Sequence, residues 1–144
     1  MNKQMSGLIL LGLLILTACN SEGPPLATSP EDIVGIFAVH PGNTILRFDP
    51  DGTTVAAPSL YLAKNPVGDP GYFRFEGNHL IFESADDPDP VCGGATAIYQ
   101  VQLLEEGKLR FVAIEDDCQH RVNVFQGPIN EETGQPRNVW SPTE

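Results

Sequence analysis

Short runs of alternating apolar and polar residues, separated by turn residues, occupy most of the chain after residue 31. Alternation with a period of two places successive side chains on opposite faces of a strand, so that one face can be buried. Turn signals separate several of these runs: Asp49-Pro50-Asp51-Gly52, Gly77-Asn78 and Glu105-Glu106-Gly107. The pattern predicts strands at residues 33–39, 44–48, 53–57, 72–76, 79–83, 95–104, 108–115 and 121–126.

The number and spacing of these runs predict an all-β fold. About eight short strands at intervals of roughly ten residues are typical of a sandwich or a barrel. After residue 31, no run of ten or more residues repeats with the period of a helix, so we expect very little helix. A meander of antiparallel strands avoids open edges by closing on itself, which favours a small antiparallel up-and-down barrel. The alternation also assigns one face of each of two strands: Tyr99, Val101 and Leu103, and Leu109, Phe111 and Ala113.

The N-terminus has the features of a secretory signal. Lys3 is followed by an apolar run at residues 7–16, which is too short for a membrane span of ~20 residues. The run ends in Leu16-Thr17-Ala18-Cys19, which resembles the lipobox of bacterial lipoproteins. This resemblance implies that residues 1–18 are removed and that Cys19 becomes the N-terminus, carrying a diacylglyceryl group and anchored by its acyl chains. The alternative is an ordinary signal peptide with a chance cysteine.

Two segments flank the predicted barrel domain, which spans residues 31–127. Residues 19–30 comprise the lipidated cysteine and a stretch rich in proline, serine, threonine and glycine, which predicts a flexible tether. A docking peptide is the alternative for that stretch. Residues 128–144 lose the alternation and are predicted to form a C-terminal tail, from which the single tryptophan, Trp140, packs back on the barrel.

The chain has three cysteines, an odd number for an exported protein. Lipidation of Cys19 would leave Cys92 and Cys118 as a pair. Exported domains fold in an oxidising compartment, so we expect one disulfide between these two residues. A metal site is the competing interpretation, but the two cysteines are 26 positions apart and have no CxxC spacing.

Taken together, the turns and aromatic residues resemble the lipocalin-like domains of many bacterial lipoproteins, over about residues 33–127. The residues that carry the resemblance are Gly35-Ile36-Phe37, Phe48-Asp49-x-Asp51-Gly52-Thr53, Gly71-Tyr72-Phe73 with Phe75, the pair Cys92 and Cys118, and Asp117-Cys118-x-x-Arg121. In that family, an arginine of the last strand packs on a tryptophan of the first and closes one end of the barrel. The resemblance implies that Arg121 and Phe37 take these places, with phenylalanine in place of the tryptophan. It also implies that a small apolar ligand is held in the barrel.

Composition and charge exclude some functions. Acidic residues outnumber basic ones 19 to 8, giving a net charge of −11, so we expect no nucleic-acid partner. His40, His79 and His120 are scattered, and no nucleophile motif or phosphate-binding loop is present, so we expect no enzyme, no catalytic residue and no cofactor.

Two acidic clusters flank the predicted disulfide, Asp86, Asp87 and Asp89 before Cys92, and Glu115, Asp116 and Asp117 before Cys118. If the disulfide brought them together, their oxygens could bind Ca²⁺ weakly. The spacing of an EF-hand is absent, and we favour two solvated loops with no metal site.

The sequence thus predicts a protein of the bacterial cell envelope, held to the membrane by lipid with its domain outside the cytoplasm. Its barrel would bind or present a small apolar ligand. The alternative is a structural or interaction lipoprotein with a filled barrel, no ligand and a contact to another envelope protein. The two differ in the interior, because a ligand needs an apolar cavity of ~300 Å³ or more.

Overall fold

A computed structural model describes residues 23–40, 42–83, 92 and 94–144. The predicted signal peptide, Cys19 and the aspartates at 86, 87 and 89 lie outside the described residues. Among the described residues, no helix is long and apolar enough to cross a membrane.

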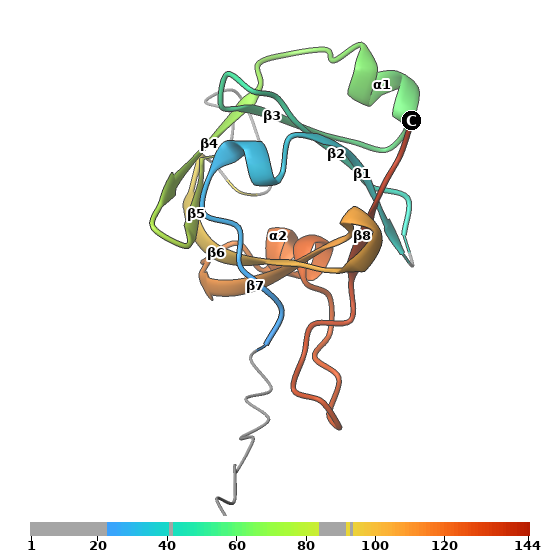
Figure 1. Ribbon diagram of the computed structural model, residues 1–144. Coiled ribbons are helices and arrows are strands. Elements are labelled where there is room, and N and C mark those ends of the chain that lie inside the picture. Colours follow the sequence, from blue (N-terminus) through green and yellow to red (C-terminus); the bar gives the residue numbers. More distant parts are fainter. Residues whose placement is uncertain (1–22, 41, 84–91, 93) are drawn as a thin grey trace, which may run out of the picture.

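Eight antiparallel strands form a closed barrel (Figure 1). Each strand pairs with the next along the chain and β8 pairs with β1, so the topology is the simple up-and-down order predicted from the alternation. The strands are β1 (Gly35–His40), β2 (Ile45–Phe48), β3 (Thr53–Ala57), β4 (Gly71–Glu76), β5 (His79–Glu83), β6 (Thr96–Leu103), β7 (Leu109–Glu115) and β8 (Val139–Pro142). The helices are α1 (Leu60–Lys64) and α2 (Gln119–Phe125), with 3-10 turns η1 (Pro30–Asp32) and η2 (Glu105–Gly107).

The hairpin between β4 and β5 forms where the sequence predicts it. Glu76 pairs with His79, which leaves Gly77 and Asn78 as a two-residue connection. Gly77 has a φ of 62°, a left-handed conformation that glycine adopts without steric cost.

The predicted eighth strand is wrong, because residues 121–125 lie in α2 and Gln126 is the C-cap residue of that helix. Arg121 and Phe125, four positions apart, are both buried, as residues on one face of a helix are. Gly127, with a φ of 65°, follows the helix and ends it. Strand β8 takes the eighth place, with Trp140 paired to Val39 of β1 and to Leu109 of β7.

The barrel therefore extends beyond the predicted boundary at residue 127. Trp140 is fully buried, as expected, but it belongs to a strand and not to a tail.

The segment that leads into β8 also caps the C-terminal end of α2, whose last carbonyls have no partner inside the helix. Asn138 Nδ2 donates to the carbonyl oxygens of Asn123, at 3.3 Å, and Val124, at 2.8 Å. Trp140 Nε1 donates to the carbonyl oxygen of Phe125 at 2.9 Å.

The segment predicted as a flexible tether is attached to the barrel from Pro25 onward. The backbone N–H of Ala27 donates to the carbonyl of Val101 at 2.8 Å, and the N–H of Leu103 donates to the carbonyl of Pro25 at 2.7 Å. Ala27 is fully buried. The apolar pair Leu26-Ala27 thus attaches this segment to β6, and the folded domain begins before the predicted residue 31.

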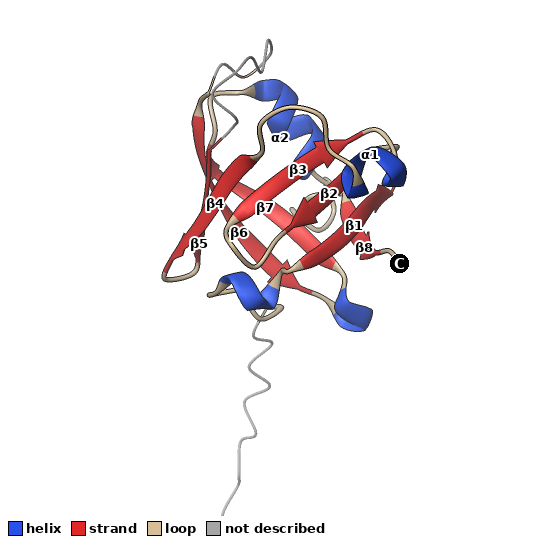
Figure 2. Ribbon diagram, turned by 90° about the horizontal axis from the view of Figure 1, so that it is seen from above, coloured by secondary structure: helices blue, strands red, loops and turns tan. Residues whose placement is uncertain are grey.

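The two ends of the barrel carry different elements (Figure 2). Turns η1 and η2 lie at one end, which we call the N-terminal end because the described chain enters there. Helices α1 and α2 lie at the other end, which we call the mouth.

Aromatic side chains fill the interior of the barrel. The faces that the alternation assigns on β6 and β7 point inward, since Tyr99, Val101, Leu109 and Phe111 are almost completely buried. Leu103 and Ala113, on the same faces, are partly buried against the core. The ring of Phe111 lies at the centre, 6.1 Å from Phe48, 6.2 Å from Tyr99, 5.9 Å from Trp140 and 5.2 Å from Phe125, measured between centroids.

Candidate functional site

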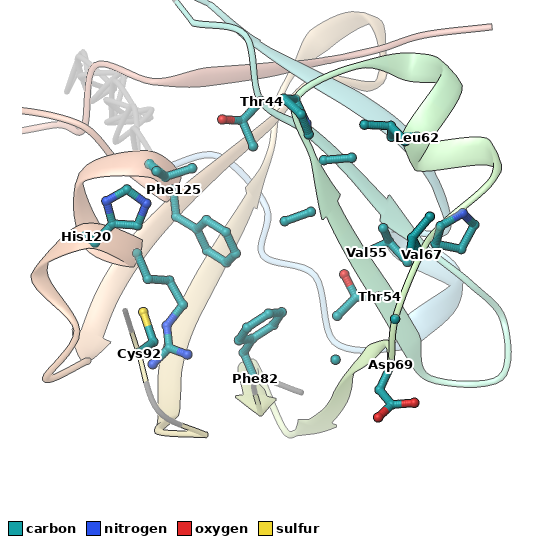
Figure 3. A pocket seen from close by; sticks show the side chains of 18 of the residues that line it. Thr44, Thr54, Val55, Leu62, Val67, Asp69, Phe82, Cys92, His120 and Phe125 are labelled. Carbon is teal, nitrogen blue, oxygen red and sulfur yellow. The ribbon is translucent and has the colours of Figure 1, made fainter. Parts of the chain in front are cut away.

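A cavity of about 660 Å³ lies at the mouth (Figure 3). Strand β3 and the α1 segment form one side of it, and α2 with Phe82 of β5 forms the other. Its lining is mainly apolar. The apolar side chains of the lining include Ala56, Leu62, Val67, Phe82, Val124 and Phe125. Cavities that hold small molecules range over ~300–1,000 Å³ and are mostly apolar with a few polar groups.

The cavity exists because β3 and β4 separate early. They pair at only two positions, Thr53 with Tyr72 and Thr54 with Gly71. Beyond Thr54, β3 stays paired with β2 as far as Ala57 but has no partner on the β4 side. After Ala57 the chain passes through α1 before it returns to the barrel at Gly71. Helix α1 is held on the outside of the wall by Arg47, whose Nη1 donates to the carbonyl of Ala63 at 2.6 Å.

Arg121 does not take the place that the resemblance implied. It lies in α2, and its guanidinium is over the ring of Phe82, 5.3 Å from the centroid, and not over Phe37. Phe37 packs edge-on against Phe48, inside β1 and β2. The barrel is closed by the pairing of β8 with β1, so the predicted barrel-closing contact of Phe37 with Arg121 is wrong.

The physical reason is that a buried guanidinium needs a carboxylate. Arg121 is 5 % exposed and makes a two-pronged ion pair with Asp116, with Nε to Oδ2 and Nη2 to Oδ1 both at 2.7 Å. Its Nη1 donates to the carbonyl of Ala95 at 2.8 Å. Through its bonds to Asp116 and Ala95, Arg121 thus joins α2 both to the end of β7 and to the segment just before β6.

Asp116 is the centre of a buried polar cluster. Its carboxylate also accepts hydrogen bonds from the hydroxyl of Tyr99 and from the N–H of Cys118. Burial by itself would raise the pKa of Asp116, but the hydrogen bonds from Arg121, Tyr99 and Cys118 outweigh it and lower that pKa. Burial and the neighbouring Asp116 carboxylate raise the pKa of Tyr99, which therefore stays protonated. The carboxylate of Asp116 therefore serves a structural role, in the ion pair with Arg121.

The predicted disulfide between Cys92 and Cys118 is confirmed, with Cα atoms 5.4 Å apart. Cys118 is the N-cap residue of α2, and Cys92 lines the cavity. The disulfide therefore ties α2 to the segment before β6 at the mouth, next to the ion pair of Arg121.

The predicted histidines lie in different places. His40 ends β1, His79 begins β5, and His120 lines the rim of the cavity, exposed to solvent. Within the described part of the chain, no group of three or more His, Cys, Asp or Glu residues could hold a metal ion.

Sequence reasoning missed Thr54, Ala56 and Val67, which line the cavity. The only signal for them is the segment 58–70, where alternation is lost between two strands and proline and glycine are frequent.

No family model, curated protein or solved structure matches the chain. The class of the protein is therefore defined by its architecture. It is a closed, eight-stranded, up-and-down antiparallel barrel with a cavity at one end, which is consistent with a lipocalin-like fold.

Proposed function

We propose that the protein is a lipid-anchored protein of the bacterial cell envelope whose barrel binds a small apolar ligand at its mouth. The observation that carries the proposal is the cavity of about 660 Å³, which is apolar along most of its wall. Burial of an apolar molecule against side chains such as Leu62, Val124 and Phe125 would supply the binding free energy through the hydrophobic effect. No polar constellation suited to covalent chemistry lines the described part of this cavity, so binding is the proposed activity.

The anchor is proposed from the lipobox-like sequence that ends in Cys19. The described chain begins at Gly23 and enters the barrel at the N-terminal end, opposite the mouth (Figure 2). A lipid on Cys19 would therefore hold the N-terminal end near the membrane and leave the cavity facing away from it. In this orientation the cavity would load from the surrounding aqueous space.

Replacing Cys19 with serine tests the anchor. Serine lacks the thiol that is alkylated, so the Cys19→Ser variant should accumulate as a precursor and incorporate no labelled palmitate. A variant with both Cys92→Ser and Cys118→Ser should still be labelled, because those residues form the disulfide. Cleavage of the Cys19→Ser precursor, together with an unlabelled native protein, would show that the segment is an ordinary signal peptide.

A bulky residue at Ala56 tests the cavity. Ala56 lies two positions after Thr54 on β3, so its side chain points to the same face of the strand and lines the cavity. The Ala56→Trp variant should lose at least about tenfold in affinity for apolar molecules, because the indole occupies the space they need. The measurement is native mass spectrometry of the delipidated mature protein after addition of an extract of membrane lipids and other apolar compounds.

Val34→Trp is the matched control. Val34 is 39 % exposed and lies between η1 and β1, at the N-terminal end. This variant should bind as the native protein does. Equal binding by Ala56→Trp and the native protein would refute the cavity as the site.

The packed interior supports a second candidate function. Phe48, Phe111, Tyr99 and Trp140 are almost completely buried and fill much of the barrel, as in a scaffold without a ligand. Such a protein would act by contact with another envelope protein. The absence of any bound apolar compound in the native protein after the extract is added would favour this second function.

A further inference from the structure

We propose that the ligand is an uncharged apolar molecule that carries one hydroxyl or carbonyl oxygen, and that Thr54 Oγ1 forms a hydrogen bond with that oxygen. This inference rests on the proposed function, since it names the chemical class that the cavity at the mouth would take.

The first observation is an unpartnered hydroxyl. Thr54 is 2 % exposed, and its Oγ1 is fully buried with no hydrogen-bond partner in the described part of the chain. Buried polar side-chain atoms in folded proteins almost always have a partner, so an exception calls for a physical explanation. A ligand atom that completes the hydrogen bond is such an explanation, because Thr54 also lines the cavity.

The second observation is the direction of the side chain. A Cβ atom built on Gly71 would lie 3.2 Å from Thr54 Cγ2, so the methyl group of Thr54 faces β4. The hydroxyl points the other way, toward the inside of the cavity (Figure 3). Thr54 and Gly71 form the last pair before β3 and β4 separate. The hydroxyl therefore stands at the point where the wall opens, at the deep side of the cavity.

The third observation is where charge lies around the cavity. Asp69 and His120 line the rim and are exposed to water. The buried charge of Arg121 is paired with Asp116. An ionised ligand group next to Thr54 would lose its hydration and gain only a neutral hydroxyl, which is unfavourable. A hydroxyl group both donates and accepts, so it suits an alcohol or a ketone equally well.

Four probes of equal chain length test this proposal: octane, 1-octanol, 2-octanone and octanoate. Their affinities are measured by displacement of an apolar fluorescent dye from the mature protein at neutral pH. The polar probes are less hydrophobic than octane, so each affinity is first corrected with the octane–water partition coefficient of the probe. After this correction, the native protein should bind 1-octanol and 2-octanone about tenfold more tightly than octane. Octanoate should be the weakest of the four.

Thr54→Val keeps the shape of the side chain and removes the hydroxyl. It should reduce the corrected preference for the polar probes to about twofold or less while octane binds as before. Thr54→Ser should retain the preference. Thr96→Val is the matched control, because Thr96 is exposed on β6 and does not line the cavity, and it should behave as the native protein does. Thermal unfolding of each variant confirms that the protein titrated is folded.

The outcomes separate the two proposals. If no probe displaces the dye from the native protein, the proposed function and this inference both fail. If octane binds and Thr54→Val keeps the preference for 1-octanol, or if octanoate binds most tightly, the cavity binds ligands but the role of Thr54 is refuted. If Thr54→Val is unfolded, Thr54→Ala decides, because alanine also removes the hydroxyl: a lost preference for 1-octanol supports the role of Thr54, and a retained preference refutes it.

Discussion

Replacing Trp140 with alanine is expected to lower the free energy of unfolding by about 3–5 kcal/mol, the range for truncating a large buried aromatic side chain. Trp140 is fully buried, and its indole packs edge-on against Phe111, with 5.9 Å between centroids, and against Phe125, with 6.1 Å. It also donates its Nε1 hydrogen to the carbonyl of Phe125. The change would leave a void where β8 closes the barrel onto β1 and would leave the end of α2 without one of its caps.

Urea denaturation of the native and variant proteins measures this loss. Trp140→Phe should cost less, about 1–3 kcal/mol, because a ring remains but the buried carbonyl of Phe125 loses its donor. Tyr61→Ala is the matched control, since Tyr61 is 73 % exposed and its truncation should change stability by no more than about 0.5 kcal/mol. A loss for Trp140→Ala as small as that of Tyr61→Ala would contradict the assignment of residues 139–142 to the barrel.

Breaking the buried ion pair should have an effect of the same size. Arg121→Met removes the guanidinium and leaves the Asp116 carboxylate buried without its counter-ion, which typically costs about 3–5 kcal/mol. Arg74→Met is the matched control, because Arg74 pairs with Glu83 at 2.8 Å on the surface with half of its side chain exposed. An exposed pair of this kind contributes about 1 kcal/mol or less. Equal losses in the two variants would show that the Arg121 pair has no special structural role.

The contribution of the pair should also depend on pH. The pKa of Asp116 is lowered in the folded protein, so the stabilisation is complete above the unfolded-state pKa of about 3.9. It is lost as the pH falls through the folded-state pKa, because the carboxylate must then be protonated. The difference in stability between the native protein and Arg121→Met, measured by urea denaturation, should therefore be large at pH 7 and shrink below about pH 4. A difference that is constant from pH 7 to pH 2 would contradict this assignment.

The strands that could be predicted from the sequence are those with a clear period of two and a marked turn beside them. Residues 79–83 were predicted as a strand and form one, because Gly77-Asn78 fixes the register of the hairpin locally. The paired faces of β6 and β7 follow in the same way, with Tyr99 opposite Ala113 and Val101 opposite Phe111. In these elements the information lies within a few residues along the chain.

The sequence predicts a strand where α2 forms, because the residues of this segment also alternate in polarity. Arg121, Asn123 and Gln126 are polar and Val122 and Val124 are β-branched, which favours a strand when the segment is considered alone. The helix is decided by tertiary contacts, chiefly the ion pair with Asp116 and the caps from Asn138. A local signal was nevertheless present, since Gly127-Pro128 is a common way to end a helix.

The cavity could not be predicted because it depends on where pairing stops. The strand at residues 53–57 is correct, but nothing in its sequence indicates that its second half has no partner on the β4 side. Thr54 is an ordinary strand threonine in the sequence. Its environment becomes special only when Gly71 pairs with it and Phe82 and Phe125 come around the same space.

The most direct test of the central claim is a titration of the mature protein with 1-octanol, followed by NMR of its methyl groups. Binding in the cavity predicts shifts that are confined to methyl groups of the lining, such as Leu62, Val67 and Val124. Those of Val101 and Leu109, deep in the packed interior, and of Ile114, which is exposed, should change little. No change in any methyl group at saturating 1-octanol, or changes centred on Ile114 and not on the lining, would contradict the claim that the mouth of this barrel is a ligand-binding site.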